Sequence, residues 1–253
     1  MLRKLITSLC LSVAIGLGSV SWAADFQKGL EAYYEGDYAT AVREWTYRAE
    51  QGDADAQYNL GLMYDLGQGV PQDYKAAVKW YTLSAEQGNA KAQFNLGLIY
   101  SAGKDVPQDD KTALKWLTLS AEQGNADAQL NVGVMYVAGK GVSQDYKAAV
   151  KWLTLAAEQG HVSAQAGLAN FYSRGIGVLQ DIIRAHMWFA VAAAQGSPGI
   201  IRDFFGMGKP ELMWKPEDIA KKRDELAKKM TPSQIKRAQR LARECVKKDY
   251  KNC

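Results

Sequence analysis

The sequence predicts an all-α fold, an α-solenoid built from pairs of antiparallel helices. When the sequence is shifted against itself by 36 residues, identical side chains align in successive units. Each unit holds two helix-length segments that end at a glycine, and a residue able to cap a helix precedes most of them. The clearest columns hold glutamine, tyrosine and tryptophan, namely Gln57, Gln93, Gln129 and Gln165; Tyr64, Tyr100, Tyr136 and Tyr172; and Trp80, Trp116, Trp152 and Trp188. A constant period of this length is typical of stacked repeats.

The period also defines the organisation of the chain. Residues 25–52 form a shortened first unit, four full units follow at 53–88, 89–124, 125–160 and 161–196, and the C-terminal region 197–253 lacks the period. The first unit has a short loop at Gly36-Asp37, and its Trp45 lies one place later than the other tryptophans relative to the shared ending Ala-Glu-Gln-Gly. An altered, degenerate terminal repeat is what a solenoid needs to cap an exposed end.

The first helix of each full unit is expected to start after an N-cap candidate such as Asp53 and to stop at a glycine such as Gly67. Leu60 and Tyr64 are spaced to share one buried face. Between them lies Gly61, which recurs in the next two units as Gly97 and Gly133. This column predicts that the partner helix packs closely at that point.

The second helix of each unit is expected to start after an aspartate that caps it, at Asp73, Asp109, Asp145 and Asp181. It ends at a glycine such as Gly88. Ala77 and Ala85 permit close approach of a neighbour, and we expect Trp80 and its equivalents each to bury about 150–250 Å².

The C-terminal region is expected to hold an irregular segment and two helices. Residues 197–215 combine glycine and proline with apolar side chains. Pro216 opens a predicted helix that ends near Met230. Thr231, Pro232 and Gln234 then provide an N-cap, a proline at the first helical position and a capping-box glutamine for a helix reaching about Lys247. We expect this basic helical cap to cover the last repeat.

Residues 1–24 have the features of a cleaved signal peptide. Two basic residues precede an apolar run from Leu5 to Val20, and the small residues around Ala23 and Ala24 suit a signal peptidase. A membrane anchor or a buried N-terminal helix is the alternative, but the run is about 16 residues, whereas a bilayer span needs roughly 20. We therefore expect a periplasmic or secreted protein.

The mature chain would keep two cysteines, Cys245 and Cys253. An even number in an oxidising compartment favours a disulfide, although two free thiols are the alternative. Such a bond would stabilise the end of the chain by about 2 kcal/mol. No Cys-x-x-Cys pair is present, and two histidines offer little for zinc, so we expect no metal site and no cofactor.

Charge is divided unevenly along the chain. Residues 25–196 hold 14 Lys and Arg against 19 Asp and Glu, whereas residues 197–253 hold 15 against 8. The basic region could bind an anionic membrane or wall polymer, and export makes nucleic acid the poorest partner. A solvated face of the helical cap is the alternative.

The repeated pattern AxAQxNLGxxYxxGxGVxQDxxKAxxWxxxAAExG resembles the Sel-one-like repeat, a relative of the tetratricopeptide repeat with a longer loop between its helices. The resemblance covers residues 25–196, and the ending RDELAKKMTPSQIKRAQRLAREC resembles the C-terminal segment of many bacterial members. The pattern departs at Asp105, which replaces the second loop glycine, and at Ser143, which replaces the loop proline.

The resemblance implies a right-handed superhelix that acts as an adaptor surface, often in envelope regulation, cell-wall processes or host contact. We therefore expect a non-enzymatic scaffold that binds a peptide segment of another envelope or secreted protein. Because cysteine-rich exported members are linked to β-lactam binding or hydrolysis, a β-lactam or peptidoglycan hydrolase is the alternative. This chain lacks the repeat cysteines of those members and contains neither Gly-x-Ser-x-Gly nor His-Glu-x-x-His.

In repeats of this type the first helices line the concave face, where side chains not used in packing can contact a partner. Four columns vary between units: Asp55, Lys91, Asp127 and Ser163; Tyr58, Phe94, Leu130 and Ala166; Leu62, Leu98, Val134 and Asn170; and Asp65, Ser101, Val137 and Ser173. Asn59, Asn95 and Asn131 stand where tetratricopeptide units hold peptide backbone, and an amide can both donate and accept hydrogen bonds. Drift on a solvated face, or asparagines that bond the neighbouring repeat, is the alternative.

Overall fold

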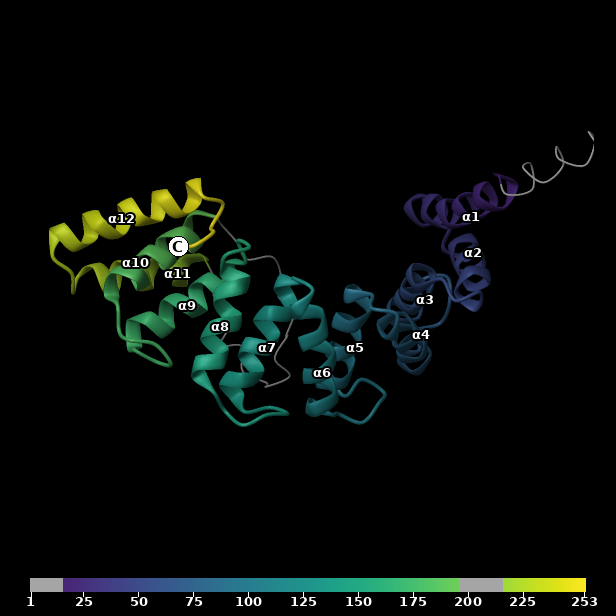
Figure 1. The fold of residues 1–253 in the computed structure, drawn as a ribbon, viewed down its shortest axis with the longest axis horizontal. Coiled ribbons are helices and arrows are strands. Elements are labelled where there is room, and N and C mark those ends of the chain that lie inside the picture. Colours follow the sequence, from purple (N-terminus) through teal and green to yellow (C-terminus); the bar gives the residue numbers. More distant parts are fainter. Residues whose placement is uncertain (1–15, 196–215) are drawn as a thin grey trace, which may run out of the picture. The chain divides into compact units, whose positions relative to one another are not determined.

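The protein is all α-helical in the part of the chain that the structure describes, residues 16–195 and 216–253 of a computed structural model. Twelve helices and no strand occupy these two ranges (Figure 1), which confirms the predicted fold class. The first 15 residues of the predicted signal peptide and the expected irregular segment 197–215 lie outside the described residues.

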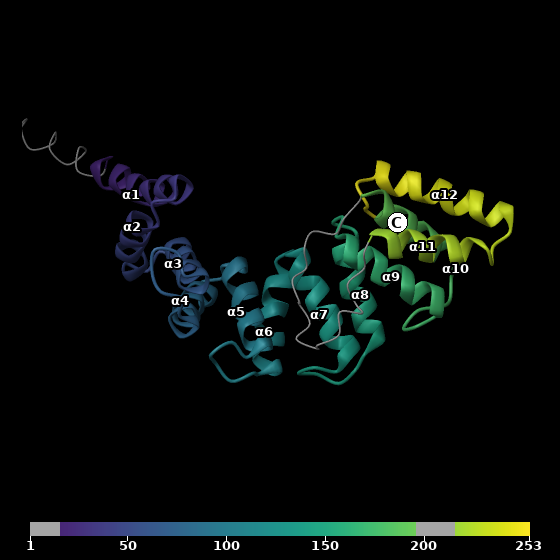
Figure 2. The same cartoon turned by 180° about the vertical axis from the view of Figure 1, so that it is seen from behind.

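Two compact units divide the chain, residues 1–92 and residues 93–253. The first holds α1 (Gly16–Glu35), α2 (Tyr38–Glu50), α3 (Ala54–Leu66), α4 (Tyr74–Glu86) and the start of α5 (Ala90–Ala102). The second holds the rest of α5 and then α6 (Asp110–Glu122), α7 (Ala126–Ala138), α8 (Tyr146–Ala157), α9 (Val162–Arg174), α10 (Ile182–Ala194), α11 (Pro216–Ala227) and α12 (Pro232–Lys247). Within the units α1 packs on α2, α3 on α4, α7 on α8 and α9 on α10 (Figure 2).

The predicted caps fix where the helices begin and end. Asp73 accepts hydrogen bonds from the backbone N–H groups of Lys75 (2.9 Å) and Ala76 (3.0 Å), and its three equivalents cap α6, α8 and α10 in the same way. Gly67 ends α3 with a left-handed backbone at φ 68°, a conformation that costs glycine nothing. Short polar loops therefore separate helices of about 13 residues.

The loop between the paired helices keeps its shape where glycine is missing. Gly69 has φ 71°, and a Cβ on it would lie 2.5 Å from the carbonyl oxygen of Tyr38 on α2. Asp105, at the equivalent position, has φ 50°. Aspartate is one of the few side chains that tolerate this region, at a cost of roughly 1–2 kcal/mol.

Helix pairs approach closely at the glycine column, as predicted. A Cβ on Gly61 would lie 2.7 Å from the Tyr81 ring, and one on Gly97 would lie 2.6 Å from Cγ of Leu117. Gly133 has the same relation to Leu153, at 3.1 Å. These glycines exist because the partner helix places a large side chain directly against the backbone.

The tryptophan column is covered less completely than the position that follows it. Trp80, Trp116 and Trp152 are half-buried, whereas the residue after each is buried, giving the column Tyr81, Leu117, Leu153 and Phe189. The outer surface of each half-buried ring lies beneath the preceding lysine, with Lys79 Nζ 4.9 Å from the Trp80 centroid. Trp45 belongs to the buried column, which explains its offset of one residue, and a Cβ on Gly29 would lie 2.5 Å from its Nε1.

A buried glutamine links successive repeats at the ends of their second helices. Gln129, 4% exposed, donates from Nε2 to the carbonyl oxygen of Ala121 in the preceding repeat (3.0 Å) and accepts from Gln159 of its own repeat (2.8 Å). Gln165 makes the same contacts with Ala157 and Gln195. In the compact unit of residues 1–92, Gln57 makes them with Ala49 and Gln87. We call this contact the glutamine link.

The predicted C-terminal cap forms as two helices packed on α10, and both lie beside it in Figure 1. α12 begins with the expected capping box of Thr231 and Gln234. Cys245 and Cys253 are joined by a disulfide, which confirms that prediction, and the backbone N–H of Asn252 donates to the side chain of Glu158, the C-cap residue of α8 (3.1 Å). The C-terminal turn is thus held on the repeat array.

His186 of α10 is buried beneath this cap. Burial lowers its pKa, and the nearby Arg223 of α11 lowers it further, so folding favours the neutral form of the ring. Because its pKa is lower in the folded state than in the unfolded one, this histidine reduces stability as the pH falls below its ordinary value.

Replacement of two glycines by alanine should have opposite effects on stability. Gly97→Ala forces a methyl group against Leu117 and should reduce the free energy of unfolding by about 1–3 kcal/mol. Gly167→Ala is the matched control, because a Cβ there would meet nothing closer than 3.8 Å. It should stabilise α9 by up to about 1 kcal/mol. Urea unfolding followed by circular dichroism measures both, and equal effects would contradict the close approach.

Candidate partner-binding surface

In the compact unit of residues 1–92, the predicted contact residues lie on α3 and at the start of α5. Tyr58 is half-buried, with its ring 5.9 Å from that of Tyr81, and Lys91 Nζ lies 6.0 Å from the Tyr58 centroid. Asn59 and Leu62 are half-buried on the same helix. An aromatic ring with a cation near its face is therefore available on this surface.

In the compact unit of residues 93–253, the predicted contact residues lie on α5 and α7. Phe94, Asn95 and Leu98 are half-buried on α5, and Val134 is half-buried on α7. Phe94 and Leu98 pack on one side against a core cluster that includes Leu117. Their other sides stay accessible, so this part of the surface is a row of partly exposed apolar side chains.

Other predicted contact residues are committed to the fold. Leu130 is 5% exposed and Asn131 is 7% exposed, and the Asn131 side chain donates to the backbone carbonyl of Asp127. Ser163 and Ala166 in the last repeat are also buried. The expectation that these four side chains remain free of packing was wrong, and Asn131 bonds its own helix, not a neighbouring repeat.

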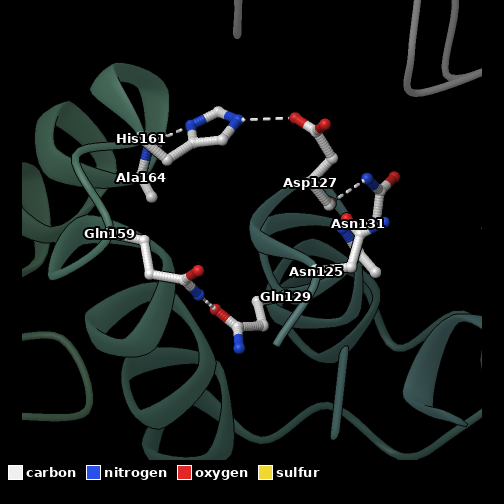
Figure 3. Close-up of polar contacts among 8 residues, drawn as sticks. Asn125, Asp127, Gln129, Asn131, Gln159, His161 and Ala164 are labelled. Atoms are coloured by element: carbon white, nitrogen blue, oxygen red, sulfur yellow. Dashed lines mark hydrogen bonds and ion pairs between the residues drawn. The ribbon is translucent and has the colours of Figure 1, made fainter. Parts of the chain in front are cut away.

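Asp127 joins two repeats, as Figure 3 shows. Its Oδ1 lies 3.1 Å from Nε2 of His161, the residue that caps α9. Nδ1 of the same ring accepts a hydrogen bond from the backbone N–H of Ala164 (3.4 Å), which places the ring proton on Nε2. The hydrogen bond from His161 outweighs partial burial and holds the pKa of the Asp127 carboxyl below its ordinary value.

This link was missing from the sequence prediction, which treated the acidic first-turn residues as free. In the compact unit of residues 1–92, Asn89 Nδ2 donates to Asp55 Oδ1 (2.9 Å). The N-cap residue of one repeat thus forms a hydrogen bond with a carboxylate of the preceding repeat. The signal was present in the sequence, since an N-cap residue with a second polar atom follows each aspartate by 34 positions. Both aspartates remain exposed and can still accept from a partner.

The described residues show little catalytic chemistry. Among them no group of three or more His, Cys, Asp and Glu side chains is placed to hold a metal ion. Two Ser-x-x-Lys sequences occur, but Ser101 lies in the last turn of α5 with Lys104 beyond the helix end, and Ser233 and Lys236 are exposed on α12. The described part of the chain also contains no helix both apolar and long enough to cross a membrane.

Comparisons with known proteins agree with the repeat structure. The model of the Sel1 repeat matches residues 54–89, 90–125, 126–161 and 162–197, each one residue later than the units defined by the period. A Sel1 repeat protein from Oxalobacter formigenes is 34% identical, with a TM-score of 0.66, over 83% of this chain and 88% of that one. A comparison with curated proteins found no match.

A longer protein is similar over most of this chain. The protective antigen c5321 of uropathogenic Escherichia coli, described as displaying an SLR fold, is 33% identical with a TM-score of 0.72. The match covers 90% of this chain but 46% of the antigen, so the chain spans just under half of that protein's length.

The Asp127 link should contribute to stability in a pH-dependent way. Because the folded carboxyl has the lower pKa, its contribution is complete above the ordinary value near 3.8 and is lost as the pH falls through the folded value. The effect should be small, since this side chain is 65% exposed. An NMR titration of the carboxyl measures it directly.

His161→Asn provides the matched control, because Asn89 fills the same position and still bonds its aspartate. In this variant the α9 cap and the hydrogen bond should both persist, so the Asp127 pKa should stay below its ordinary value, whereas His161→Ala, which removes the bond, should let it rise. An ordinary Asp127 pKa in the unaltered protein would show that the hydrogen bond is absent in solution.

Proposed function

The chain belongs to the Sel1 repeat family, and from that premise we propose that it is an exported scaffold that binds a peptide segment of another envelope or secreted protein. Sel1 repeat proteins are scaffolds that mediate protein–protein interactions. The export, the envelope role and the peptide-binding residues are our proposal for this chain. Binding uses the partly exposed columns of α5 and α7 in residues 93–253, and the equivalent side chains of α3 belong to the other compact unit.

The observation that carries this proposal is the row of half-buried apolar side chains, best developed at Phe94, Leu98 and Val134. Interfaces obtain most of their binding energy from a few anchors of this kind, which pack into a partner and exclude water. Because the core side of Phe94 and Leu98 is already packed, little side-chain entropy would be lost when a partner covers the other side.

The frame around this row favours an extended ligand. Within residues 93–253, the links of Gln129 and Gln165 and the close-packed Gly97 and Gly133 hold each repeat on the next in the same register. A chain laid across α5 and α7 would meet different chemistry at each repeat while its backbone contacts the amide of Asn95. Asp127 adds an exposed acceptor for cationic or N–H groups.

No observation favours the hydrolase alternative. His161 uses both ring nitrogens to hold α9 and Asp127, and His186 is buried beneath the cap, which favours its neutral form. Neither imidazole is accessible and paired with a nucleophile, as a general base must be.

Export by a cleaved signal accounts for the apolar leader, which α1 continues through Ala23 and Ala24 into the first repeat. Protein recovered from the periplasm or the medium should begin after Ala23 or Ala24, as measured by intact mass. The same spectrum should show one disulfide, since Cys245 and Cys253 pair. Full-length chain retained in the membrane fraction would instead establish an anchor.

A photoreactive amino acid at position 94 should crosslink to the partner in cells that export the protein. Position 119 on α6 is the matched control, because Leu119 is also apolar and accessible but lies outside the columns. Crosslinking at both positions with equal yield would reject the proposed surface.

Affinity for the captured partner gives a second measure. Phe94→Ala combined with Leu98→Ala should weaken binding by at least about 30-fold, the effect of losing one strong anchor. Leu119→Ala combined with Leu155→Ala removes two accessible leucines elsewhere and should leave binding within about threefold. Circular dichroism must show equal helicity in both variants.

A further inference from the structure

α12 carries a straight row of four cations. Lys236, Arg240, Arg243 and Lys247 follow one another at intervals of four, three and four residues, so they share one face of the helix, and all four are exposed. At a rise of 1.5 Å per residue the row is about 16 Å long. We call it the basic stripe.

The opposite face of α12 is already used. Ala238 and Cys245 are buried, and Ile235 and Leu241 pack against the core that α10 helps to form. The disulfide from Cys245 holds the end of the helix as well. The helix therefore cannot rotate about its axis to insert its apolar face into a bilayer, and the basic stripe stays on the outer surface.

The stripe is largely unneutralised. Arg240 lies 3.7 Å from Glu244, but Lys236, Arg243 and Lys247 have no ion pair within residues 216–253 or elsewhere in the described chain. Like charges one turn apart destabilise a helix. α11 does not extend the stripe, because exposed acidic and basic residues are mixed along it, as with Lys221 and Glu225.

We propose that the basic stripe docks the protein on the surface of a bilayer containing anionic phospholipids. A row of charges along a rigid helix touches a plane at all four points at once, and each basic side chain near such a surface strengthens binding. A protein partner would need a dry apolar centre, but Val246 is the one large apolar side chain exposed on the described α12. Binding is thus electrostatic, without insertion.

Vesicle sedimentation with the full mature chain tests this proposal. Binding to phosphatidylcholine vesicles containing 30% phosphatidylglycerol should be strong at low salt and should fall steeply as salt rises. Each charge contributes about fivefold, so the triple variant Lys236→Gln, Arg243→Gln and Lys247→Gln should bind about a hundredfold more weakly. The charge-preserving variant Lys236→Arg, Arg243→Lys and Lys247→Arg should bind as the unaltered protein does.

A control variant with the same net charge as the triple stripe variant distinguishes binding by the basic stripe from attraction that depends on net charge alone. Lys75→Gln, Lys111→Gln and Lys147→Gln remove three exposed lysines at the starts of α4, α6 and α8. This variant should bind within about threefold of the unaltered protein. Three results would overturn the proposal: equal losses in the two neutralised variants, no binding at low salt, or undiminished binding in 0.5 M salt, where the screening length is only about 4 Å. Tighter binding to soluble polyglutamate than to vesicles would also overturn it, in favour of an acidic protein.

Discussion

The glutamine link is the interaction on which the rest of the array depends. Helix ends leave carbonyl groups without intrahelical partners, and a buried amide costs free energy unless its own hydrogen bonds are made. The carbonyl of Ala121 already accepts from the backbone N–H of Gly124 (3.0 Å). Gln129 donates a further hydrogen bond to it and accepts from Gln159, so the buried amide both donates and accepts. The link sets the register of one repeat on the next. The register in turn aligns the columns that could contact a partner.

Local chemistry made much of the fold predictable from the sequence. Asp73, Gly67 and Thr231 act through hydrogen bonds or backbone conformations within a few residues, so their roles can be recognised without knowing the neighbours. The short distance from Gly97 to Leu117 was predictable for a related reason. A glycine recurring inside an amphipathic helix has few explanations other than close approach.

The sequence alone could not show which of two adjacent apolar residues is buried in the core. Trp80 and Tyr81 differ by about 100° around α4, and both are suitable for a core. The structure buries the tyrosine and leaves the tryptophan half-covered beneath Lys79. The candidate site failed for a similar reason at Leu130, whose burial depends on packing in three dimensions. Side-chain bonds across 34 residues, such as that between Asp127 and His161, likewise need the repeats to be stacked before they can be seen.

The glutamine link also bears on how arrays of this kind change in length. Gln129 and Gln159 belong to one repeat, and the acceptor Ala121 belongs to the preceding one. A duplicated repeat would therefore bring its own glutamines and present a fresh alanine carbonyl to its successor, leaving no buried amide unpaired. Insertion or deletion of part of a repeat would leave a buried glutamine without one of its hydrogen-bond partners. Gene duplication in whole units is thus structurally inexpensive, and relatives that share this frame are free to evolve binding surfaces of different extent.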